Sequence, residues 1–354
     1  MPERVAEFEI GYTRLIAPDG RTVGALPDFA RDGDTLKALY RALIRTRTFD
    51  AKAIALQRTG RLGTYASSIG QEAVSVGTAS AMEAADVLVP SFREHGAQLW
   101  RGATPLELFL YWGGDERGNV FEVPREDFPI SVPVGTHAPH AVGVALAFKL
   151  RREPRVAVCI FGDGATSKGD VAEAMNMAGV WRVPLVFVIA NNQWAISVRR
   201  AEQSAAATLA QKAIAAGIPG EQVDGNDVVA VCAVVGAAIE RARSGNGPSV
   251  IEAITYRLGD HTTSDDASRY RDDEEPRRHW PEEPALRLRN YLSAMGLWKR
   301  GDEDHLLKEA AAEIDAAADA YLATPAQDPA TIFDFTYAAL PADLAAQREQ
   351  GLAR

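Results

Sequence analysis

The amino-acid sequence predicts an α/β fold in which a mostly parallel sheet is covered by helices on both faces. Two apolar segments in the middle of the chain, residues 156–161 and 185–190, have the length of buried strands. The residues between them, 170–181, carry apolar side chains at helical spacing, and Pro184 closes that pattern. A strand, a helix and a second strand in this order are typical of a βαβ unit, whose two strands run parallel.

Segments on either side of this unit continue the alternation of helices and strands. Before it, the apolar spacing is helical in two segments. After it, two more helical segments precede a β-rich one. The predicted helices cover residues 35–60, 71–82, 208–216 and 227–243, and the further strand covers residues 250–256.

Composition divides the chain into three predicted regions. Residues 1–34 are polar and contain turn signals, which indicates an N-terminal arm. Residues 35–283 form the main domain, and its last part, 257–283, is so rich in Asp and Glu that we expect an exposed, mobile loop. Residues 284–354 return to helical spacing and end in a tail, and we expect them to pack on the same domain.

The overall composition excludes several classes of protein. Of the 354 residues, 47% are hydrophobic and 24% are charged, as in ordinary globular proteins, and the net charge is −10. Because a negative chain is poorly matched to nucleic acid or to an anionic membrane surface, neither is expected as a partner. The longest apolar run, residues 183–190, is far shorter than the roughly 18 residues that a membrane-spanning helix needs.

Two further features predict a cytoplasmic protein. The first residues, 1–7, lack the apolar core that a signal peptide requires. Cys159 and Cys232 lie in apolar stretches without a CxxC pattern, so we expect buried thiols in a reducing compartment.

Polar residues follow the two strands of the predicted βαβ unit. Gly162-Asp163-Gly164 comes after the first strand and Asn191-Asn192 after the second. The carboxyl ends of parallel strands meet at one edge of the sheet, so Asp163 and Asn192 are expected to converge there. A carboxylate and an amide oxygen, completed by phosphate oxygens, suit Mg²⁺, and the glycines allow a phosphate to approach the backbone. This pattern predicts a cradle for magnesium and a diphosphate.

Other readings of the same glycines are weaker. A dinucleotide-binding fingerprint needs its third glycine earlier than Gly169 and an acidic residue about 20 positions further on, where this chain is apolar. No GxxxxGK[ST] motif is present, so a nucleoside triphosphatase is unsupported. Gly-Asp-Gly alone is most often a simple turn, and the pairing with Asn191-Asn192 makes the signal specific.

The segment from Gly162 to Asn192 resembles the diphosphate-binding motif of thiamine-diphosphate enzymes. More widely, residues 35–345 resemble the alpha subunit of the first component of 2-oxo acid dehydrogenase complexes, which implies the thiamine-diphosphate-binding fold. Four further parts of the sequence carry this resemblance: Ser68–Ala73, Ser91–Glu94, Thr208–Lys212 with Gln222–Gly225, and Gly259–Asp266.

The resemblance implies a cofactor site, residue by residue. It gives three magnesium ligands: Asp163, Asn192 and the main-chain carbonyl of Trp194. It also gives residues around thiamine diphosphate: Phe92, Arg93, Val132, Val134, Gly162, Gly164, Ala165, Asn192 and His261. Arg93 is the one expected to grip the diphosphate, because a guanidinium fork fits phosphate oxygens.

His261 is the residue to which the resemblance assigns catalysis. It lies in the charged loop, beside the expected diphosphate, and an imidazole there can donate a hydrogen bond or transfer a proton. The alternative is an exposed loop histidine. Phe92 stands where a tyrosine is frequent in the family, so any hydrogen bond of that hydroxyl is lost. Two points stay open: whether His137 faces the pocket, and whether Thr262, Ser264 or Ser268 is ever phosphorylated.

The implied activity is thiamine-diphosphate-dependent oxidative decarboxylation of pyruvate, with transfer of the acyl unit to the lipoyl group of a partner acyltransferase. A branched-chain 2-oxo acid, 3-methyl-2-oxobutanoate, is the alternative substrate. A subunit that binds the diphosphate without catalysis is an alternative of another class. The resemblance places an activating glutamate on a separate beta subunit, so we expect an α2β2 heterotetramer, with the apolar face of the 71–82 helix as a contact.

Overall fold

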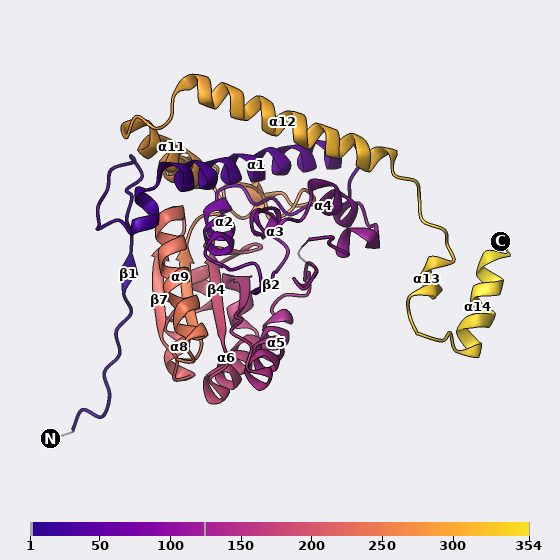
Figure 1. Ribbon diagram of the computed structural model, residues 1–354, viewed down its shortest axis with the longest axis horizontal. Coiled ribbons are helices and arrows are strands. Elements are labelled where there is room, and N and C mark those ends of the chain that lie inside the picture. Colours follow the sequence, from indigo (N-terminus) through magenta and orange to yellow (C-terminus); the bar gives the residue numbers. More distant parts are fainter. Residues whose placement is uncertain (1–2, 124, 354) are drawn as a thin grey trace.

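The computed structural model describes residues 3–123 and 125–353, and it is built on a parallel sheet. Residues 1–2 of the predicted arm and residue 354 of the predicted tail lie outside this part. The sheet has six strands in the order β1-β7-β8-β4-β3-β2, and all of its pairs are parallel (Figure 1). The strands are β1 (Tyr12–Thr13), β2 (Val87–Val89), β3 (Ala157–Gly162), β4 (Leu185–Asn191), β7 (Gly220–Asp224) and β8 (Ser249–Ile254).

The predicted βαβ unit is confirmed. Strands β3 and β4 are parallel neighbours, with Ala157 opposite Leu185 and Gly162 opposite Ala190. Helix α6 (Gly169–Trp181) connects them. The register brings the ends of both strands to the same edge, and therefore Asp163 and Asn192 to neighbouring positions.

Helices cover both faces of the sheet, as predicted. Successive side chains of β3 point to opposite faces, so Val158 and Ile160 join one core and Cys159 and Phe161 the other. The first core includes α1 (Gly33–Arg58), α2 (Glu72–Ser80), α9 (Val228–Arg243), α11 (Pro284–Ala294) and α12 (Arg300–Ala323). The second includes α5 (His137–Arg151), α6 and α8 (Lys212–Ala215).

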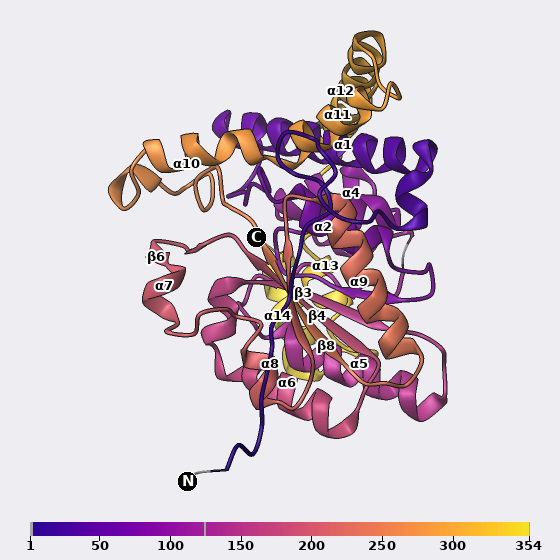
Figure 2. The same cartoon turned by 90° about the vertical axis from the view of Figure 1, so that its left-hand side faces the viewer.

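The remaining elements are short or peripheral. In the sequence, helices α3 (His95–Arg101) and α4 (Pro105–Trp112) come between β2 and α5. After β4, the chain forms a hairpin of β5 (Trp194–Ala195) and β6 (Val198–Arg199), followed by α7 (Arg200–Gln203). Figure 2 shows β6 and α7 lying out from the sheet. Further along are α10 (Glu274–His279), α13 (Thr331–Asp334) and α14 (Ala342–Leu352).

Acidic side chains define several helix starts. Asp32 accepts hydrogen bonds from the free backbone N–H groups at the start of α1, and Glu283 does the same for α11. Asp227 caps α9 and also accepts from the backbone N–H groups of Leu15 and Ile16. Asp227 therefore ties the N-terminal region to the main domain.

Two sequence-based expectations need correction, and a third is largely confirmed. Helix α2 was expected to offer an apolar face to a partner, but Glu72 to Ala79 are all buried inside this chain, because α1, α3 and α9 pack around them. Residues 257–283 are mostly exposed or half-buried, as predicted, although Arg257 and Arg271 are buried and the segment contains α10 and two short 3-10 helices. The mobility of this segment stays a prediction. The helix predicted over 208–216 is reduced to α8, since only its last part is helical.

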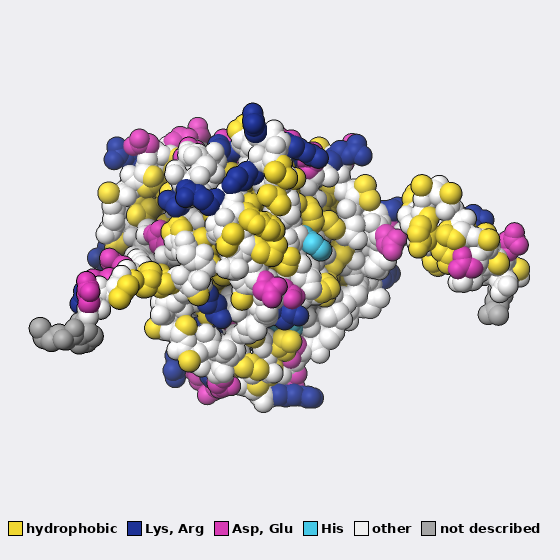
Figure 3. Space-filling view, turned by 90° about the horizontal axis from the view of Figure 1, so that it is seen from below, with side chains coloured by type: hydrophobic (Ala, Val, Ile, Leu, Met, Phe, Trp, Pro, Cys, Tyr) yellow, Lys and Arg dark blue, Asp and Glu magenta, His cyan; other side chains and the backbone are white. Residues whose placement is uncertain are grey.

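The C-terminal residues extend away from the body of the molecule. Figure 1 shows α13 and α14 at the end of an extended segment of the chain that follows α12. Phe335 is 83% exposed there. On the α5–α6 side, Figure 3 shows hydrophobic side chains at the surface among charged ones, and Leu150, Val180 and Trp181 are exposed on these helices. No helix in the described part of the chain combines the length and the apolar character needed to cross a bilayer.

Candidate active site

A cavity of about 190 Å³ lies at the carboxyl edge of β3 and β4. Most of the predicted site residues line it: Phe92, Arg93, Val134, Gly162, Asp163, Gly164, Ala165, Asn192, Trp194 and His261. They come from five separate parts of the sequence, which the fold brings together. Val132 is not among the lining residues and is 53% exposed.

Asp163 is the first residue of a 3-10 helix, η3 (Asp163–Ser167), that follows β3 directly. Its side chain is almost completely buried, and burial raises the pKa of the carboxyl from its ordinary 3.8 to about 6. Oδ2 accepts a hydrogen bond of 2.9 Å from Nε2 of Gln203. A carboxylate in this position carries an uncompensated electrostatic cost, which a cation would relieve.

Asn192 lies beside Asp163, and its amide orientation follows from its partners. Nδ2 donates to Oε1 of Gln71 at 2.9 Å, while Oδ1 accepts from the backbone N–H of Trp194 at 3.2 Å. The carbonyl of Trp194 lies 3.5 Å from Nη1 of Arg257. The amide oxygen and this carbonyl are therefore both acceptors at the same edge of the sheet.

These groups fit a hard cation that also binds phosphate. The described residues contain no cluster of three or more His, Cys, Asp or Glu side chains that could hold a metal alone. One carboxylate, one amide oxygen and one carbonyl leave coordination positions for phosphate and water, as Mg²⁺ prefers. At Gly164 an added Cβ would lie 2.8 Å from Cβ of Ala195, so only glycine fits this turn.

Arg93 reaches the cavity from the loop before α3 and is buried. Nη1 donates to the carbonyl of Ser67 at 2.5 Å, and Nη2 donates to the carbonyl of His261 at 3.0 Å. Burial and the nearby Arg257 lower the pKa of Arg93 to about 10, so the group is still a cation at neutral pH. Among the described residues no carboxylate forms an ion pair with this guanidinium, and a buried cation of this kind suits an anionic ligand.

His261 is held by Arg93 in a defined protonation state. Nη2 of Arg93 lies 3.2 Å from Nδ1 of His261. Because a guanidinium can only donate, Nδ1 accepts, and the single proton of the neutral ring is assigned to Nε2. Burial, Arg93 and Arg257 together lower the pKa of His261 to about 4. At neutral pH this side chain is therefore a neutral hydrogen-bond donor through Nε2.

The loop around His261 is fixed by internal contacts. Oδ2 of Asp265 accepts from the backbone N–H of His261 at 2.9 Å and from the hydroxyl of Tyr270. Nη2 of Arg257 donates to the same hydroxyl at 2.8 Å. The charged residues of this segment thus satisfy one another, and they position His261 over the cavity.

Several residues of the site were not singled out from the sequence. Gln71 and Glu94 line the cavity, and burial raises the pKa of the Glu94 carboxyl to about 7. Both lie in segments that carried the resemblance, so the motif was the available signal. Behind Ser67, the buried Asp50 accepts from the Ser67 hydroxyl at 2.6 Å and fixes the loop that holds Arg93. Nothing in the sequence pattern indicated Gln203.

His137 does not line the cavity, which answers one of the open points. Its ring is buried, and Nε2 lies 2.9 Å from the carbonyl of Ile160, to which it donates. This contact joins the start of α5 to β3. The role of His137 is structural.

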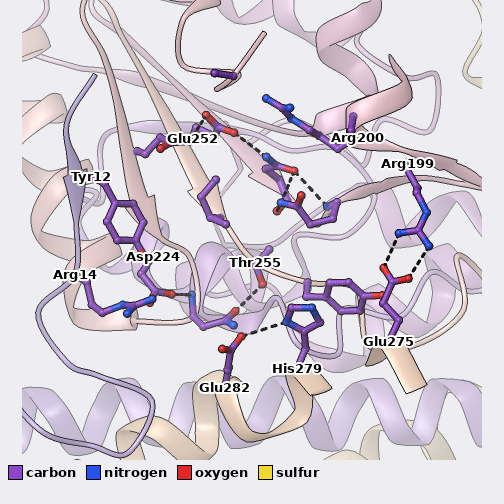
Figure 4. Close-up of a pocket in the computed structure, with 18 of the residues that line it drawn as sticks. Tyr12, Arg14, Arg199, Arg200, Asp224, Glu252, Thr255, Glu275, His279 and Glu282 are labelled. Carbon is purple, nitrogen blue, oxygen red and sulfur yellow. Dashed lines mark hydrogen bonds and ion pairs between the residues drawn. The ribbon is translucent and has the colours of Figure 1, made fainter. Parts of the chain in front are cut away.

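A larger cavity of about 650 Å³ lies across the ends of β7 and β8 (Figure 4). Several of its charged side chains form ion pairs: Asp224 with Arg14 and Arg287, and Glu275 with Arg199. None of the predicted cofactor, metal or catalytic residues lines it. Because Arg14, Arg199 and Arg287 already have carboxylate partners, this cavity offers an anionic ligand less than the smaller cavity does.

Comparisons with known proteins agree with one another. A family model described as dehydrogenase E1 component matches residues 40–330. The 3-methyl-2-oxobutanoate dehydrogenase subunit alpha of Mycobacterium tuberculosis is 44% identical over 95% of this chain and 92% of its own length. Pyruvate dehydrogenase E1 component alpha subunits are 40% identical in Acholeplasma laidlawii, over 90% of this chain and 92% of theirs, and 38% in Staphylococcus epidermidis, over 98% and 94%.

Proposed function

We propose that this chain, which belongs to the dehydrogenase E1 component family, serves as the alpha subunit of a 2-oxo acid dehydrogenase. The relatives described above are named as alpha subunits of such enzymes. The observation that supports it most directly is the cavity in which Asp163, Asn192, Arg93 and His261 meet. These are the residues that a cation, a diphosphate and a reacting 2-oxo acid require.

The family depends on thiamine diphosphate, and we infer that Mg²⁺ accompanies it here. Asp163, Asn192 and the carbonyl of Trp194 would hold the cation. When bound, thiamine diphosphate supplies a nucleophilic carbon and an electron sink for the loss of carbon dioxide from the 2-oxo acid. The donor set described above, with one buried carboxylate, fits this pair of ligands.

The protein side chains then hold and orient the reactants. Arg93 would turn its guanidinium to the diphosphate, and Gly164 and Ala165 would present their backbone to it. The start of α6 lies close by and favours an anion, because helix N-termini carry partial positive charge. His261, protonated at Nε2, would donate a hydrogen bond to an oxygen of the diphosphate or of the reacting acyl group.

We infer that a beta subunit completes the site in an α2β2 heterotetramer. Val134 lines the cavity yet is 44% exposed, and Ile196, which also lines it, is 54% exposed. Apolar side chains at the mouth of a cofactor cavity favour burial against another chain. That chain would supply the carboxylate that activates the cofactor, and the acyl unit would pass to a lipoyl group on a partner acyltransferase.

Two substrates are candidates, and each has an observation in its favour. Leu209–Gly225 and Ile332–Pro341 resemble the corresponding parts of pyruvate dehydrogenase alpha subunits, which favours pyruvate. The 44% identity to the 3-methyl-2-oxobutanoate enzyme subunit, against 38–40% to pyruvate dehydrogenase subunits, favours the branched-chain acid. Each methylene group that a substrate pocket accepts or excludes changes the selectivity between two acids by only about 10–200-fold. A few pocket side chains can therefore set the substrate, and overall identity does not decide between the two acids.

The cellular location is part of the same proposal. Cys159 and Cys232 are free thiols, as expected for a reducing compartment. We therefore place the complex in the cytoplasm.

The experiment is turnover of both acids with an artificial electron acceptor. The purified alpha chain is assayed alone and with its beta subunit, at saturating thiamine diphosphate and Mg²⁺. We expect activity from the pair, none from the alpha chain alone, and a preference for one acid. Full activity of the alpha chain alone would contradict the shared site. Cofactor binding without turnover in the complete complex would favour the non-catalytic alternative.

A further inference from the structure

Gln203, the last residue of α7, reaches across to the 3-10 helix η3 that begins at Asp163. Its Nε2 donates to Oδ2 of Asp163 at 2.9 Å, and its Oε1 accepts from the hydroxyl of Ser167 at 3.0 Å. A carboxylate can only accept, so the amide nitrogen must face Asp163. The nitrogen and the oxygen of this amide therefore bind Asp163 and Ser167, the first and last residues of η3.

The contact acts on the carboxyl group that carries the charge of the proposed cation site. Because Gln203 takes Oδ2, the other oxygen, Oδ1, is left without a side-chain donor from the described residues. Asp163 is 1% exposed, so water offers little competition for either oxygen. The hydrogen bond thus fixes the rotation of the carboxylate.

The segment that carries Gln203 has few other ties to the sheet. It leaves β4 through the β5–β6 hairpin, and Figure 2 shows it lying out from the body of the molecule. The backbone N–H of Arg200 donates to the carbonyl of Gln193 at 2.9 Å, and Arg199 pairs with Glu275 at 2.7 Å. Neither contact touches η3. Gln203 connects the segment to the cation site.

The geometry points to Gln203 as a positioning residue of the cation site, which holds Asp163 in the orientation that binds metal and ties the α7 segment to an occupied site. This inference rests on the proposed function, since it needs Asp163 to be a metal ligand. Hydrogen bonds to carboxylate ligands typically change metal affinity by about 10–100-fold when they are removed. We expect a loss of that size.

The first test is binding of Mn²⁺, a paramagnetic substitute for Mg²⁺, to the alpha–beta complex at saturating thiamine diphosphate. Free Mn²⁺ is measured by electron paramagnetic resonance. Gln203→Met keeps the length of the side chain and removes both hydrogen bonds, so the dissociation constant should rise about 10–100-fold. Ser167→Ala, which leaves the bond to Asp163, should show a smaller rise. Glu202→Ala, an exposed neighbour on α7, is the matched control and should behave as wild type.

The second test follows the α7 segment by limited digestion with trypsin, which can cut after Arg199 and Arg200. In wild type, Mg²⁺ with thiamine diphosphate should slow this cleavage several-fold, whereas in Gln203→Met the ligands should have little effect. Wild-type Mn²⁺ affinity and wild-type protection in Gln203→Met would overturn the inference. Asp163→Ala is the reference variant, and unchanged Mn²⁺ binding in it would overturn both the inference and the proposed cofactor site.

Discussion

Replacing Asp163 by asparagine should stabilise the ligand-free protein while removing its ability to bind the cation. Burial raises the pKa of this carboxyl from 3.8 to about 6, which corresponds to a cost of about 3 kcal/mol for the ionised form. Asparagine has nearly the same shape, and its amide oxygen can still accept from Gln203. We therefore expect Asp163→Asn to raise the free energy of unfolding by up to about 3 kcal/mol at pH 7.5.

The dependence on pH gives this prediction a sign. Because the folded-state pKa is raised, Asp163 binds its proton more tightly in the folded protein than in the unfolded chain. Below pH 3.8 both states are protonated and the charge costs nothing. The cost appears as the pH rises from 3.8 to about 6 and is complete above that. The advantage of the variant should therefore be largest at pH 7.5 and shrink toward pH 4.

The assay is urea denaturation of wild type and Asp163→Asn at pH 7.5 and pH 5, without metal or cofactor. A second series adds Mg²⁺ and thiamine diphosphate, which should raise the melting temperature of wild type and leave the variant unchanged. A variant that is less stable than wild type at pH 7.5 would refute the reasoning, because the charge would then be compensated within the chain. If the ligands raised the melting temperature of Asp163→Asn as much as that of wild type, the assignment of Asp163 as a metal ligand would be refuted.

Two further substitutions separate the roles of the other charged groups. His261→Ala should fold normally and bind the cofactor, yet lose acyl transfer to a lipoyl domain by about 10²–10⁴-fold, measured in single turnover; near-normal transfer would return it to a loop residue without a catalytic role. Arg93→Lys keeps the charge but not the fork that donates to Ser67 and His261, so the dissociation constant of thiamine diphosphate, measured by calorimetry, should rise about 10–100-fold, because a charged hydrogen bond contributes about 1.5–3 kcal/mol. Wild-type affinity in that variant would show that a point charge is sufficient.

The parallel βαβ unit could be predicted because its signals are local. Residues 157–162 and 185–191 are continuous apolar strands, and the connection between them is one helix. Once two parallel strands are neighbours, the residues that follow them must meet, so the proximity of Asp163 and Asn192 needed no further information. Arg93 and His261 were named only through the family resemblance, since their approach depends on loops that no periodicity describes.

The parts that could not be predicted depend on long-range packing. Strands β1 and β2 have two and three residues, too few for a pattern to be recognised. Charge density suggested that residues 257–283 are exposed, but Arg257 is buried because Trp194, Ile196 and Tyr270 supply acceptors for it. Sequence composition counts charges and does not show which of them are paired.

The electrostatics of the unliganded site connect its stability to its function. Burial raises the pKa of Asp163 and lowers the pKa values of Arg93 and His261. Each of these shifts disfavours the charged form of the side chain. Such a site is unfavourable when empty and becomes favourable when a cation and a polyanion bring the opposite charges. A ligand that binds only the folded protein stabilises it by mass action, and this stabilisation opposes the cost of burying the Asp163 carboxylate. The chain is thus built so that binding of its ligands restores the stability that the buried charges remove.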